Sequence, residues 1–391
     1  THEEHEGLSA DEVDAKIKEI GIRCPKCKGE LGPSRPFNMM FPLGVGPTGK
    51  DSAYLRPETA QGAYLNFRRE FEALRRKLPM GLAIIGRAYR NEISPRQGTY
   101  RMREFLQAEL QIFFDPASFA AQVPLAPFAE VPVRLCWSGE KSEPKAPDIA
   151  DQDIVARGLP SWYVHHLVQV QRFYLEVLQI PRERFRFAEL DVRERAFYNK
   201  VHFDVQVNQD SLGGFKEVGG VHYRTDHDLA GHEAGSHQKQ AVTVGTTKLV
   251  PHVLELSFGV DRNVWALLDL GFAPGERATL RVPARLAPIG VAVFPLVSKD
   301  GLPERAEAIY HRLRRRFTAF YDDAGSIGKR YARMDEIGTA FCVTVDHKTL
   351  EGGGVTLRDR DSQKQVRVHE DQLASRLEGL LSGETQFGPS S

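Results

Sequence analysis

Two stretches on either side of a short turn constrain the fold of this chain more than any other feature. Residues 86–92 and 100–105 are predicted to form two β-strands around a turn at 94–98. Because successive side chains of a strand point to opposite faces, one face of the hairpin is expected to carry Arg90, Glu92, Arg103, Phe105, Gln107 and Glu109. A guanidinium, an aromatic ring and several acceptors on one surface can hold a phosphate, stack a purine and orient an amine. The hairpin is therefore interpreted as a nucleotide site.

The composition is typical of a globular protein with several domains. A chain of 391 residues can form two or three domains, each with its own core. It has no run of about 18 apolar residues, so we expect no membrane span. Residues 1–6 lack the basic and apolar segments of a secretory signal. Four cysteines do not make a disulfide framework, which favours a reducing, cytoplasmic location.

The charge balance argues against nucleic-acid binding by bulk attraction. The formal net charge is zero, with 52 basic and 52 acidic residues. An RNA partner would therefore have to be held by local basic patches and by shape.

Changes in periodicity divide the chain into four parts. They are an N-terminal segment with a capping box and a Cys-x-x-Cys (1–36), a first domain (37–272) with an insertion over about 116–190, a linker (273–288), and a last domain (289–391). In the first domain we expect helices over about 63–77, 162–178 and 259–270 and strands over 201–207, 216–223 and 248–257, with an irregular excursion over 116–147. The last domain reads as an α/β module, with strands at 291–296, near 326, at 340–345 and 355–358 and helices at 303–321, 330–337 and 370–381.

Four motifs together resemble the glycyl-tRNA synthetases of the homodimeric class II type. They are Arg56–Gly62, Arg90–Glu92 with Arg103–Phe105, Val253–Arg262 and Asp335–Asp346, and the resemblance extends over about 37–381. It implies an α+β fold in which an antiparallel catalytic sheet with flanking helices precedes an α/β class IIa anticodon-binding domain. It also implies a homodimer that ligates glycine to tRNA(Gly), first forming glycyl-adenylate with ATP and then transferring the glycyl group to the 3′-terminal ribose hydroxyl.

The resemblance assigns the hairpin to ATP. Arg90 is similar to the motif 2 arginine on the α-phosphate, where a fixed guanidinium stabilises charge that builds up in the transition state. Phe105 would stack on adenine and Glu92 would contact its amino group. The alternatives are an ion pair between Arg90 and Glu92 and a core position for Phe105, which its polar neighbours on the face argue against. The other ATP-binding candidates are Asn91, Arg101 and Arg103.

A second cluster would hold the triphosphate and Mg²⁺. Arg262 is similar to the motif 3 arginine on the γ-phosphate side, near a helix N-terminus that also favours anions. Glu255 resembles the motif 3 carboxylate that helps to hold Mg²⁺, and Glu217 resembles a further acidic residue of the ATP and metal region. Alternatively, Arg262 pairs with Asp261. Arg90 and Arg262 are the candidate catalytic residues.

Three residues match the family's glycine-binding positions, namely Glu58, Glu109 and Ser257. A snug acidic pocket can hold glycine's ammonium and exclude larger amino acids by overlap. Arg224 belongs to a further family signature. Each of these residues taken alone could equally be a surface group.

Other polar groups carry weaker signals. Cys24 and Cys27 form half of a zinc knuckle, which would need His2, His5 or residues outside the chain, so a bare turn is favoured over zinc. Histidines at 222, 227, 232 and 237 recur every five residues, which places them on no single face, so we interpret them as scaffold.

The last domain offers a basic helix that could follow an RNA backbone. The tRNA-contact candidates are Arg312, Arg315, Arg316, Lys329 and Arg330, with Arg314 and Arg333 nearby. The alternative is a solvated face balanced by Glu304 and Glu307.

One family feature is not recognisable. Motif 1, which makes the dimer interface, should precede residue 37, and a missing N-terminal segment is suspected. Two other functions stay open, a different class IIa synthetase for threonine, proline or histidine, and a non-catalytic synthetase-like paralogue that binds nucleic acid.

Overall fold

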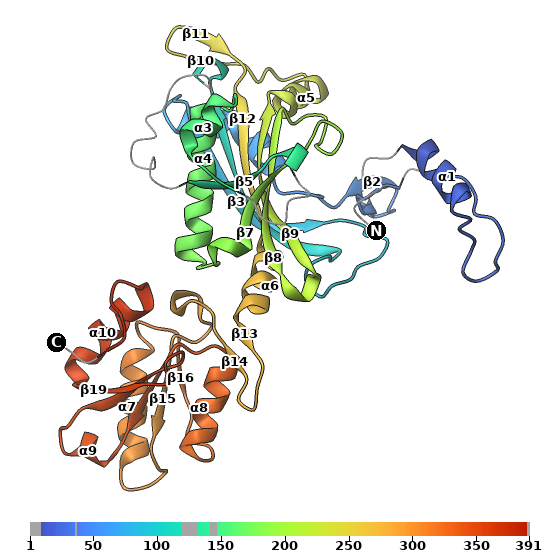
Figure 1. Cartoon of the computed structure of the whole chain (residues 1–391). Coiled ribbons are helices and arrows are strands. Elements are labelled where there is room, and N and C mark those ends of the chain that lie inside the picture. The colour runs from blue at the N-terminus through green and yellow to red at the C-terminus, as the bar shows by residue number, and fades with distance from the viewer. Residues whose placement is uncertain (1–8, 36, 119–131, 141–146, 389–391) are drawn as a thin grey trace. The chain divides into compact units, whose positions relative to one another are not determined.

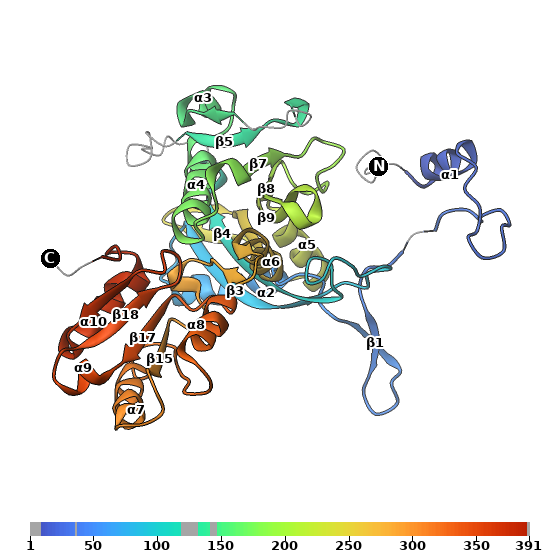
Figure 2. The same ribbon diagram turned by 60° about the horizontal axis from the view of Figure 1, so that its bottom comes forward.

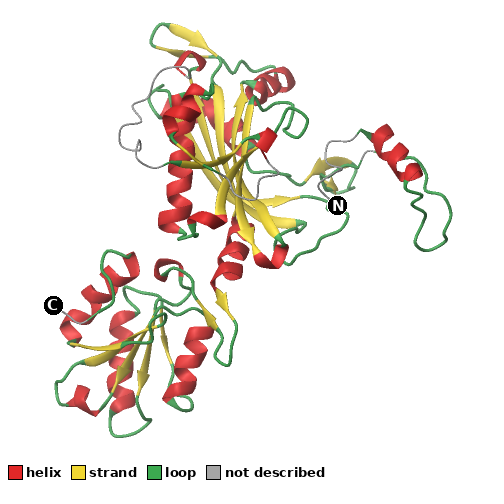
Figure 3. Cartoon of the chain, viewed as in Figure 1, coloured by secondary structure: helices red, strands yellow, loops and turns green. Residues whose placement is uncertain are grey.

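The computed structural model describes residues 9–35, 37–118, 132–140 and 147–388, and these divide into two compact units. The first is formed by the described residues up to 171 together with 182–208 and 212–265. The second is formed by 172–181, 209–211 and 266 onwards. Figure 1 labels their helices and strands, and Figure 3 distinguishes the two kinds of element.

The first unit is built on an eight-stranded sheet. Its strand order is β3-β4-β12-β9-β8-β7-β5-β6, and every neighbouring pair is antiparallel except the parallel pair β5 and β7. The strands are β3 (Met80–Tyr89), β4 (Glu104–Phe114), β5 (Val133–Cys136), β6 (Asp148–Ile149), β7 (Phe185–Glu189), β8 (Val201–Gln209), β9 (Gly214–Thr225) and β12 (His252–Gly259). Small hairpins are formed by β1 (Pro42–Val45) with β2 (Asp51–Tyr54) and by β10 (Val242–Val244) with β11 (Thr247–Leu249).

Helices of the first unit use an apolar stripe to cover the sheet. Helix α2 (Gln61–Ala73) buries Ala63, Tyr64, Phe67 and Phe71, which recur at helical spacing. The ring of Phe67 stacks on Phe113 of β4 with centroids 4.5 Å apart. The other helices of this unit are α1 (Ala10–Glu19), α3 (Asp151–Ala156), α4 (Ser161–Arg172) and α5 (His227–Ser236). The π-helical turn Phe173–Val177 belongs to the second unit, and the boundary between the units falls within α6 (Val260–Gly271). Figure 2 shows the β1–β2 hairpin projecting away from the sheet.

The described part of the expected insertion belongs to the main sheet. Strands β5 and β7 fall within 116–190, and Val133, Leu135 and Phe187 are completely buried. The expectation of an irregular excursion over 116–147 is therefore wrong for β5, since short strands with few alternating residues carry little periodic signal. Residues 119–131 and 141–146 lie outside the described residues.

The second unit is a three-layer α/β module. Its sheet has the order β16-β15-β17-β18-β19, with β15 (Val291–Pro295) parallel to β16 (Ala319–Tyr321) and β17 (Phe341–Val345). Strands β18 (Val355–Asp359) and β19 (Gln365–Val368) continue it in antiparallel order. Helices α7 (Leu302–Leu313) and α10 (Glu370–Ser382) pack on one face and α8 (Ile327–Glu336) on the other, as Figure 1 shows. The remaining elements are α9 (His347–Leu350), β13 (Phe272–Ala273) and β14 (Thr279–Leu280).

Three local predictions in the second unit are corrected. The helix predicted over 303–321 ends at Leu313, and its last residues form strand β16 instead. The strand expected near Ser326 is absent there, because Ser326 is the N-cap of α8. Strand β19 was not predicted. Cys342 is buried in β17, in agreement with the expected core position.

The two aspartates at the ends of the motif 335–346 have structural roles. Asp335 is completely buried and accepts two hydrogen bonds from the Arg358 guanidinium, at 2.8 and 3.0 Å. Arg277, from the predicted linker, lies 2.6 Å from the same carboxylate. Asp346 caps α9 and pairs with Arg367. These residues therefore stabilise the second unit. No helix in the described part of the chain is long and apolar enough to cross a membrane.

Candidate active site

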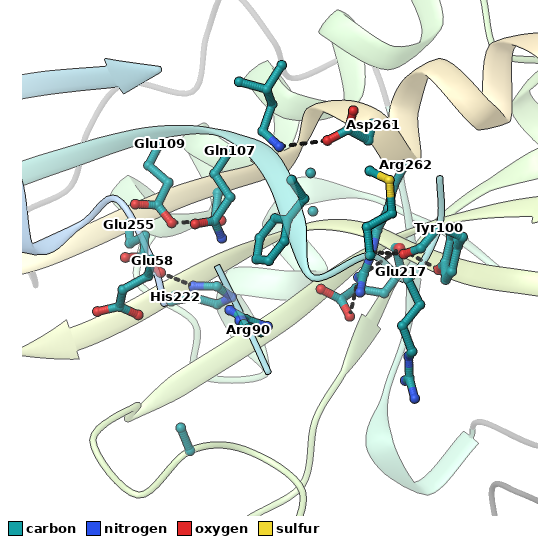
Figure 4. Close-up of a pocket in the computed structure, with 18 of the residues that line it drawn as sticks. Glu58, Arg90, Tyr100, Gln107, Glu109, Glu217, His222, Glu255, Asp261 and Arg262 are labelled. Atoms are coloured by element: carbon teal, nitrogen blue, oxygen red, sulfur yellow. Dashed lines mark hydrogen bonds and ion pairs between the residues drawn. The ribbon is translucent and has the colours of Figure 1, made fainter. Parts of the chain in front are cut away.

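A pocket opens at the centre of the eight-stranded sheet, over strands β4, β12 and β9. These strands are neighbours, and their register places Ser257 opposite both Glu109 and Gly220. The loop that joins β3 to β4 closes one side. Figure 4 shows the acidic residues at one end of the pocket and Tyr100, Glu217 and Arg262 at the other. Among the predicted site residues, the lining includes Glu58, Arg90, Glu92, Arg101, Phe105, Glu109, Glu217, Arg224, Glu255, Ser257 and Arg262.

The acidic end of the pocket is built around Glu109. Thr59 Oγ1 donates to Glu109 Oε2 at 2.7 Å, and Ser257 Oγ lies 3.4 Å from Oε1. Glu109 is only 5% exposed. Burial, together with the negative charges of Glu255 and Glu58, raises the pKa of Glu109 to about 7. The three predicted glycine-binding residues are thus brought together around a carboxyl group that is partly protonated at neutral pH.

A buried arginine balances the second carboxylate. Arg224 Nη1 lies 3.1 Å from Glu255 Oε2, and its other nitrogens bind Asp228 at 2.8 and 2.9 Å. Glu255 also accepts hydrogen bonds from His222 Nδ1 at 2.5 Å and Gln111 Nε2 at 2.7 Å. Burial alone would raise the pKa of Glu255, but Arg224 and His222 outweigh it and hold the pKa at about 2. Both oxygens of Glu255 therefore already accept hydrogen bonds from side chains of the protein.

The guanidinium and the ring of the predicted nucleotide site lie together. The Arg90 guanidinium carbon is 5.3 Å from the centroid of Phe105, and Nε donates to the Pro57 carbonyl at 3.2 Å. Glu92 also lines the pocket, and in the described part of the chain no ion pair joins it to Arg90. Arg103 does not line it, because its exposed side chain donates to the Glu92 carbonyl at 3.1 Å. Asn91 does not line it either, and its backbone nitrogen binds the Met39 carbonyl.

The opposite end carries the second arginine. Arg262 lies in the first turn of α6, and its Nη1 is 3.0 Å from Glu217 Oε2. Its guanidinium also stands 4.8 Å from the ring centroid of Tyr100, whose hydroxyl donates to the Glu217 carbonyl at 2.6 Å. Asp261 does not take the guanidinium, since it accepts the Leu106 backbone N–H at 2.6 Å. The alternative pairing of Arg262 with Asp261 is therefore not what the structure contains.

Sequence reasoning missed several pocket residues. His222 was interpreted as scaffold, yet it lines the pocket and binds Glu255. His202 also lines it and binds Asp204 at 3.1 Å. His202 shares one face of β8 with Asp204, Gln206 and Asn208, and this period-two pattern of polar residues could have identified it. On β9 the positions that alternate with His222 include Val218 and Gly220, so no such pattern marks His222. Tyr100 carries no comparable local signal. The lining residues missed include Tyr100, His202 and His222. Thr59, Gln111 and Asp204, which bind lining side chains, were missed as well.

The Cys-x-x-Cys segment forms a tight turn. The Cys24 N–H binds the Gly29 carbonyl at 3.0 Å and the Lys28 N–H binds the Cys24 carbonyl at 2.9 Å. The Cys27 backbone N–H lowers the pKa of the Cys24 thiol. Over the described ranges, no group of three or more His, Cys, Asp or Glu side chains is arranged to hold a metal ion. His2 lies outside the described residues, as does His5.

The basic side chains of the second unit differ in accessibility. Arg312 pairs with Glu370 at 3.1 Å and Arg316 with Glu378 at 2.6 Å, so α10 supplies the balancing charges expected from Glu304 and Glu307. Arg315 and Lys329 are exposed. Arg330 is only 1% exposed and donates to the carbonyls of residues 295, 296, 322 and 325. Its assignment to an RNA-binding surface is therefore corrected.

Two protein families match parts of the chain. Residues 45–124 match the tRNA synthetase class II core domain (G, H, P, S and T). Residues 290–380 match the anticodon binding domain.

Several glycine–tRNA ligases are similar to this chain over nearly its whole length. The chain is 35% identical to the glycine–tRNA ligase of Pyrococcus horikoshii, over 97% of this chain and 80% of the relative. It is 35% identical to that of Aeropyrum pernix, over 96% and 78%, and 35% identical to that of Methanothrix thermoacetophila, over 98% and 80%. The first alignment spans 464 positions, so the relative contains segments with no counterpart in these 391 residues.

Proposed function

The chain belongs to the glycine–tRNA ligase family, and from this premise we propose how the residues of its pocket divide the reaction between them. The enzyme ligates glycine to tRNA in two steps. The carboxylate of glycine attacks the α-phosphorus of ATP and pyrophosphate leaves. The 3′-terminal ribose hydroxyl of tRNA then attacks the carbonyl carbon of glycyl-adenylate and AMP leaves. No side chain needs to form a covalent intermediate, so positioning and charge stabilisation supply the catalysis.

The acidic end takes the amino acid. Glu109 accepts the ammonium of glycine, with Glu58 beside it and Ser257 as a further polar contact. Arg224 is a positioning residue, because its hydrogen bonds hold Glu255 and Asp228 in place. The side chains that line this end of the pocket would exclude a larger amino acid by overlap.

The opposite part of the pocket takes ATP. Phe105 stacks on adenine, Glu92 contacts its amino group and Arg90 binds the α-phosphate, where charge increases in the transition state. Arg262 binds the γ-phosphate end, near the N-terminus of α6. Arg101 lines the same region and supplies a further positive charge. Binding of the triphosphate would replace the present pairing of Arg262 with Glu217.

Mg²⁺ is the metal implied by ATP chemistry of this class, and one of the two predicted carboxylates fits it. The Glu217 side chain is 51% exposed beside Arg262, and Mg²⁺ is commonly held by one or two carboxylates together with substrate phosphates. Glu255 does not fit, because its oxygens already accept hydrogen bonds from Arg224, His222 and Gln111. When bound, the ion would neutralise part of the triphosphate charge.

The second unit would contact the tRNA. We assign this contact to the exposed basic side chains Arg312, Arg315, Arg316 and Lys329, without Arg330. The same proposal includes assembly as a homodimer. It also divides the chain into a catalytic domain over 37–272, a linker, and an anticodon-binding domain over 289–391.

The proposal depends on one arrangement of side chains in the pocket. A buried carboxyl group, Glu109, lies at one end of a pocket whose centre holds the Arg90 guanidinium beside the Phe105 ring. ATP–pyrophosphate exchange with each amino acid tests it, and we expect exchange with glycine alone. Exchange driven by threonine, proline or histidine would assign the chain to another class IIa activity. No exchange with any amino acid, despite binding of tRNA, would identify a non-catalytic paralogue.

A further inference from the structure

An exposed aromatic ring stands at the rim of the pocket. Phe197 lies in the segment 190–200 that joins β7 to β8, and it is 87% exposed, the largest value for a big hydrophobic side chain in the described residues. Its neighbours Ala196, Tyr198 and Asn199 all line the pocket. The ring is therefore carried by the pocket wall but points out of the core.

A chain of contacts fixes the ring at the amino-acid end. Phe197 meets Tyr198 and His227 edge-to-face, with centroids 5.3 and 5.2 Å apart. Tyr198 stacks on His227 at 5.5 Å, and the Arg224 guanidinium lies 4.5 Å from the Tyr198 centroid. Arg224 in turn binds Glu255. Through these contacts Phe197 is supported at its edge, which leaves most of its surface to solvent.

The segment that carries the ring has exposed basic side chains as well as acidic ones. Asp191 Oδ1 accepts the backbone N–H groups of Arg193 and Glu194 at 2.7 and 3.0 Å, and Glu194 Oε2 accepts the Asp191 N–H at 3.0 Å. These acidic groups are engaged in the local turn, while the side chains of Arg193 and Lys200 are exposed. An exposed aromatic ring with basic neighbours is typical of surfaces that bind single-stranded nucleic acid.

We propose that Phe197 stacks on the terminal base of the tRNA acceptor end and so guides the terminal ribose to glycyl-adenylate. The inference rests on the proposed function, because that function brings the last nucleotide of an RNA to this rim. The hydroxyl that attacks belongs to the terminal nucleotide, so its base must lie just outside the amino-acid end. Phe197 stands on that side, whereas Phe105 serves the adenine of ATP.

The test compares intact tRNA with tRNA that lacks its terminal adenosine. A stacked base is worth about 1–3 kcal/mol, which corresponds to roughly 5- to 150-fold in affinity. The wild-type enzyme should therefore bind intact tRNA at least about fivefold more tightly than the shortened tRNA, and Phe197→Ala should bind the two equally. Phe197→Trp should restore the difference. Val192→Ala is the matched control, because Val192 is 76% exposed in the same segment and carries no ring.

Two further readouts separate the possible outcomes. Phe197→Ala should keep glycine-dependent pyrophosphate exchange, which needs no tRNA, and should lose aminoacylation efficiency by the same factor as affinity. Equal discrimination between the two tRNAs by wild type and Phe197→Ala would overturn the proposal and leave the ring to another partner, such as a protein. An equal loss of exchange and aminoacylation would also overturn it. Absence of exchange in the wild type would instead contradict the proposed function.

Discussion

Lowering the pH from 8 to 6 should weaken the binding of glycine through a single group, Glu109. Its carboxyl group accepts from Thr59 and faces Ser257, and the charged side chains around it are Glu58, Glu255 and Arg224. Burial and the two neighbouring carboxylates raise its pKa to about 7. The ammonium of glycine is attracted to the ionised form and not to the neutral acid. Protonation therefore removes the attraction, and the KM for glycine should rise as the pH falls.

The size of the effect follows from the fraction of Glu109 that is ionised. With a pKa of about 7, roughly nine-tenths of the carboxyl groups are ionised at pH 8 and roughly one-tenth at pH 6. If only the ionised form binds, the KM for glycine should increase about tenfold over this interval. The KM for ATP should change much less, because Glu109 lies at the other end of the pocket.

Pyrophosphate exchange at saturating ATP measures this dependence directly. Glu109→Gln should raise the KM for glycine and make it independent of pH between 6 and 8. Glu92→Gln is the control for loss of a pocket carboxylate, and it should keep the slope. A wild-type KM that does not change over this interval would refute the reasoning. So would a slope that persists in Glu109→Gln, since the titrating group would then be another one.

Three further changes test other parts of the structure. Arg90→Ala should lower the exchange rate by about 10²- to 10³-fold, as expected for loss of a transition-state donor, with unchanged circular dichroism, and a loss within about tenfold would contradict its role. Arg224→Met leaves the Glu255 carboxylate buried without its cation, and urea unfolding should show a stability lower by about 3–5 kcal/mol. Asp335→Asn should cost a similar amount, about 3 kcal/mol, because Arg358 then lacks its carboxylate; an unfolding midpoint equal to that of the wild type would contradict the packing described for this motif.

The strand alternation predicted part of the site and failed where the strands end. Phe105, Gln107 and Glu109 lie on one face of β4, and all three line the pocket as predicted. Arg103 precedes the first residue of β4, so the alternation does not extend to it and its side chain lies outside the pocket. Period-two arguments hold only within a ladder of hydrogen bonds, and the limits of the ladder depend on the partner strand.

The pairing of strands that are distant in sequence determines which charged side chains meet, and local patterns do not reveal it. Arg224 and Glu255 are 31 residues apart, and they meet because β9 pairs with β12. A motif can mark Arg224, but it does not identify the carboxylates that surround it. The buried Arg330 is a second example, since an arginine on an amphipathic helix is expected at the surface. The two Nη nitrogens of its guanidinium donate to backbone carbonyls from β15 and from a neighbouring turn, which only the folded chain brings together.

The charges of the pocket explain how a buried acidic site can exist before its ligand arrives. Adjacent buried carboxylates cannot all ionise without strong repulsion, and here the structure separates their states. Glu255 stays ionised because Arg224 and His222 lower its pKa. Glu109 has a pKa of about 7, so near neutral pH only part of its carboxyl groups are ionised. The imidazole of His222 is held over Gly220, where an added Cβ would stand 2.2 Å from Nε2, so the strand can carry no larger side chain at that position without displacing a hydrogen bond to Glu255. The arriving ammonium then provides the positive charge that Glu109 lacks, and a ligand without a free amino group offers nothing in its place.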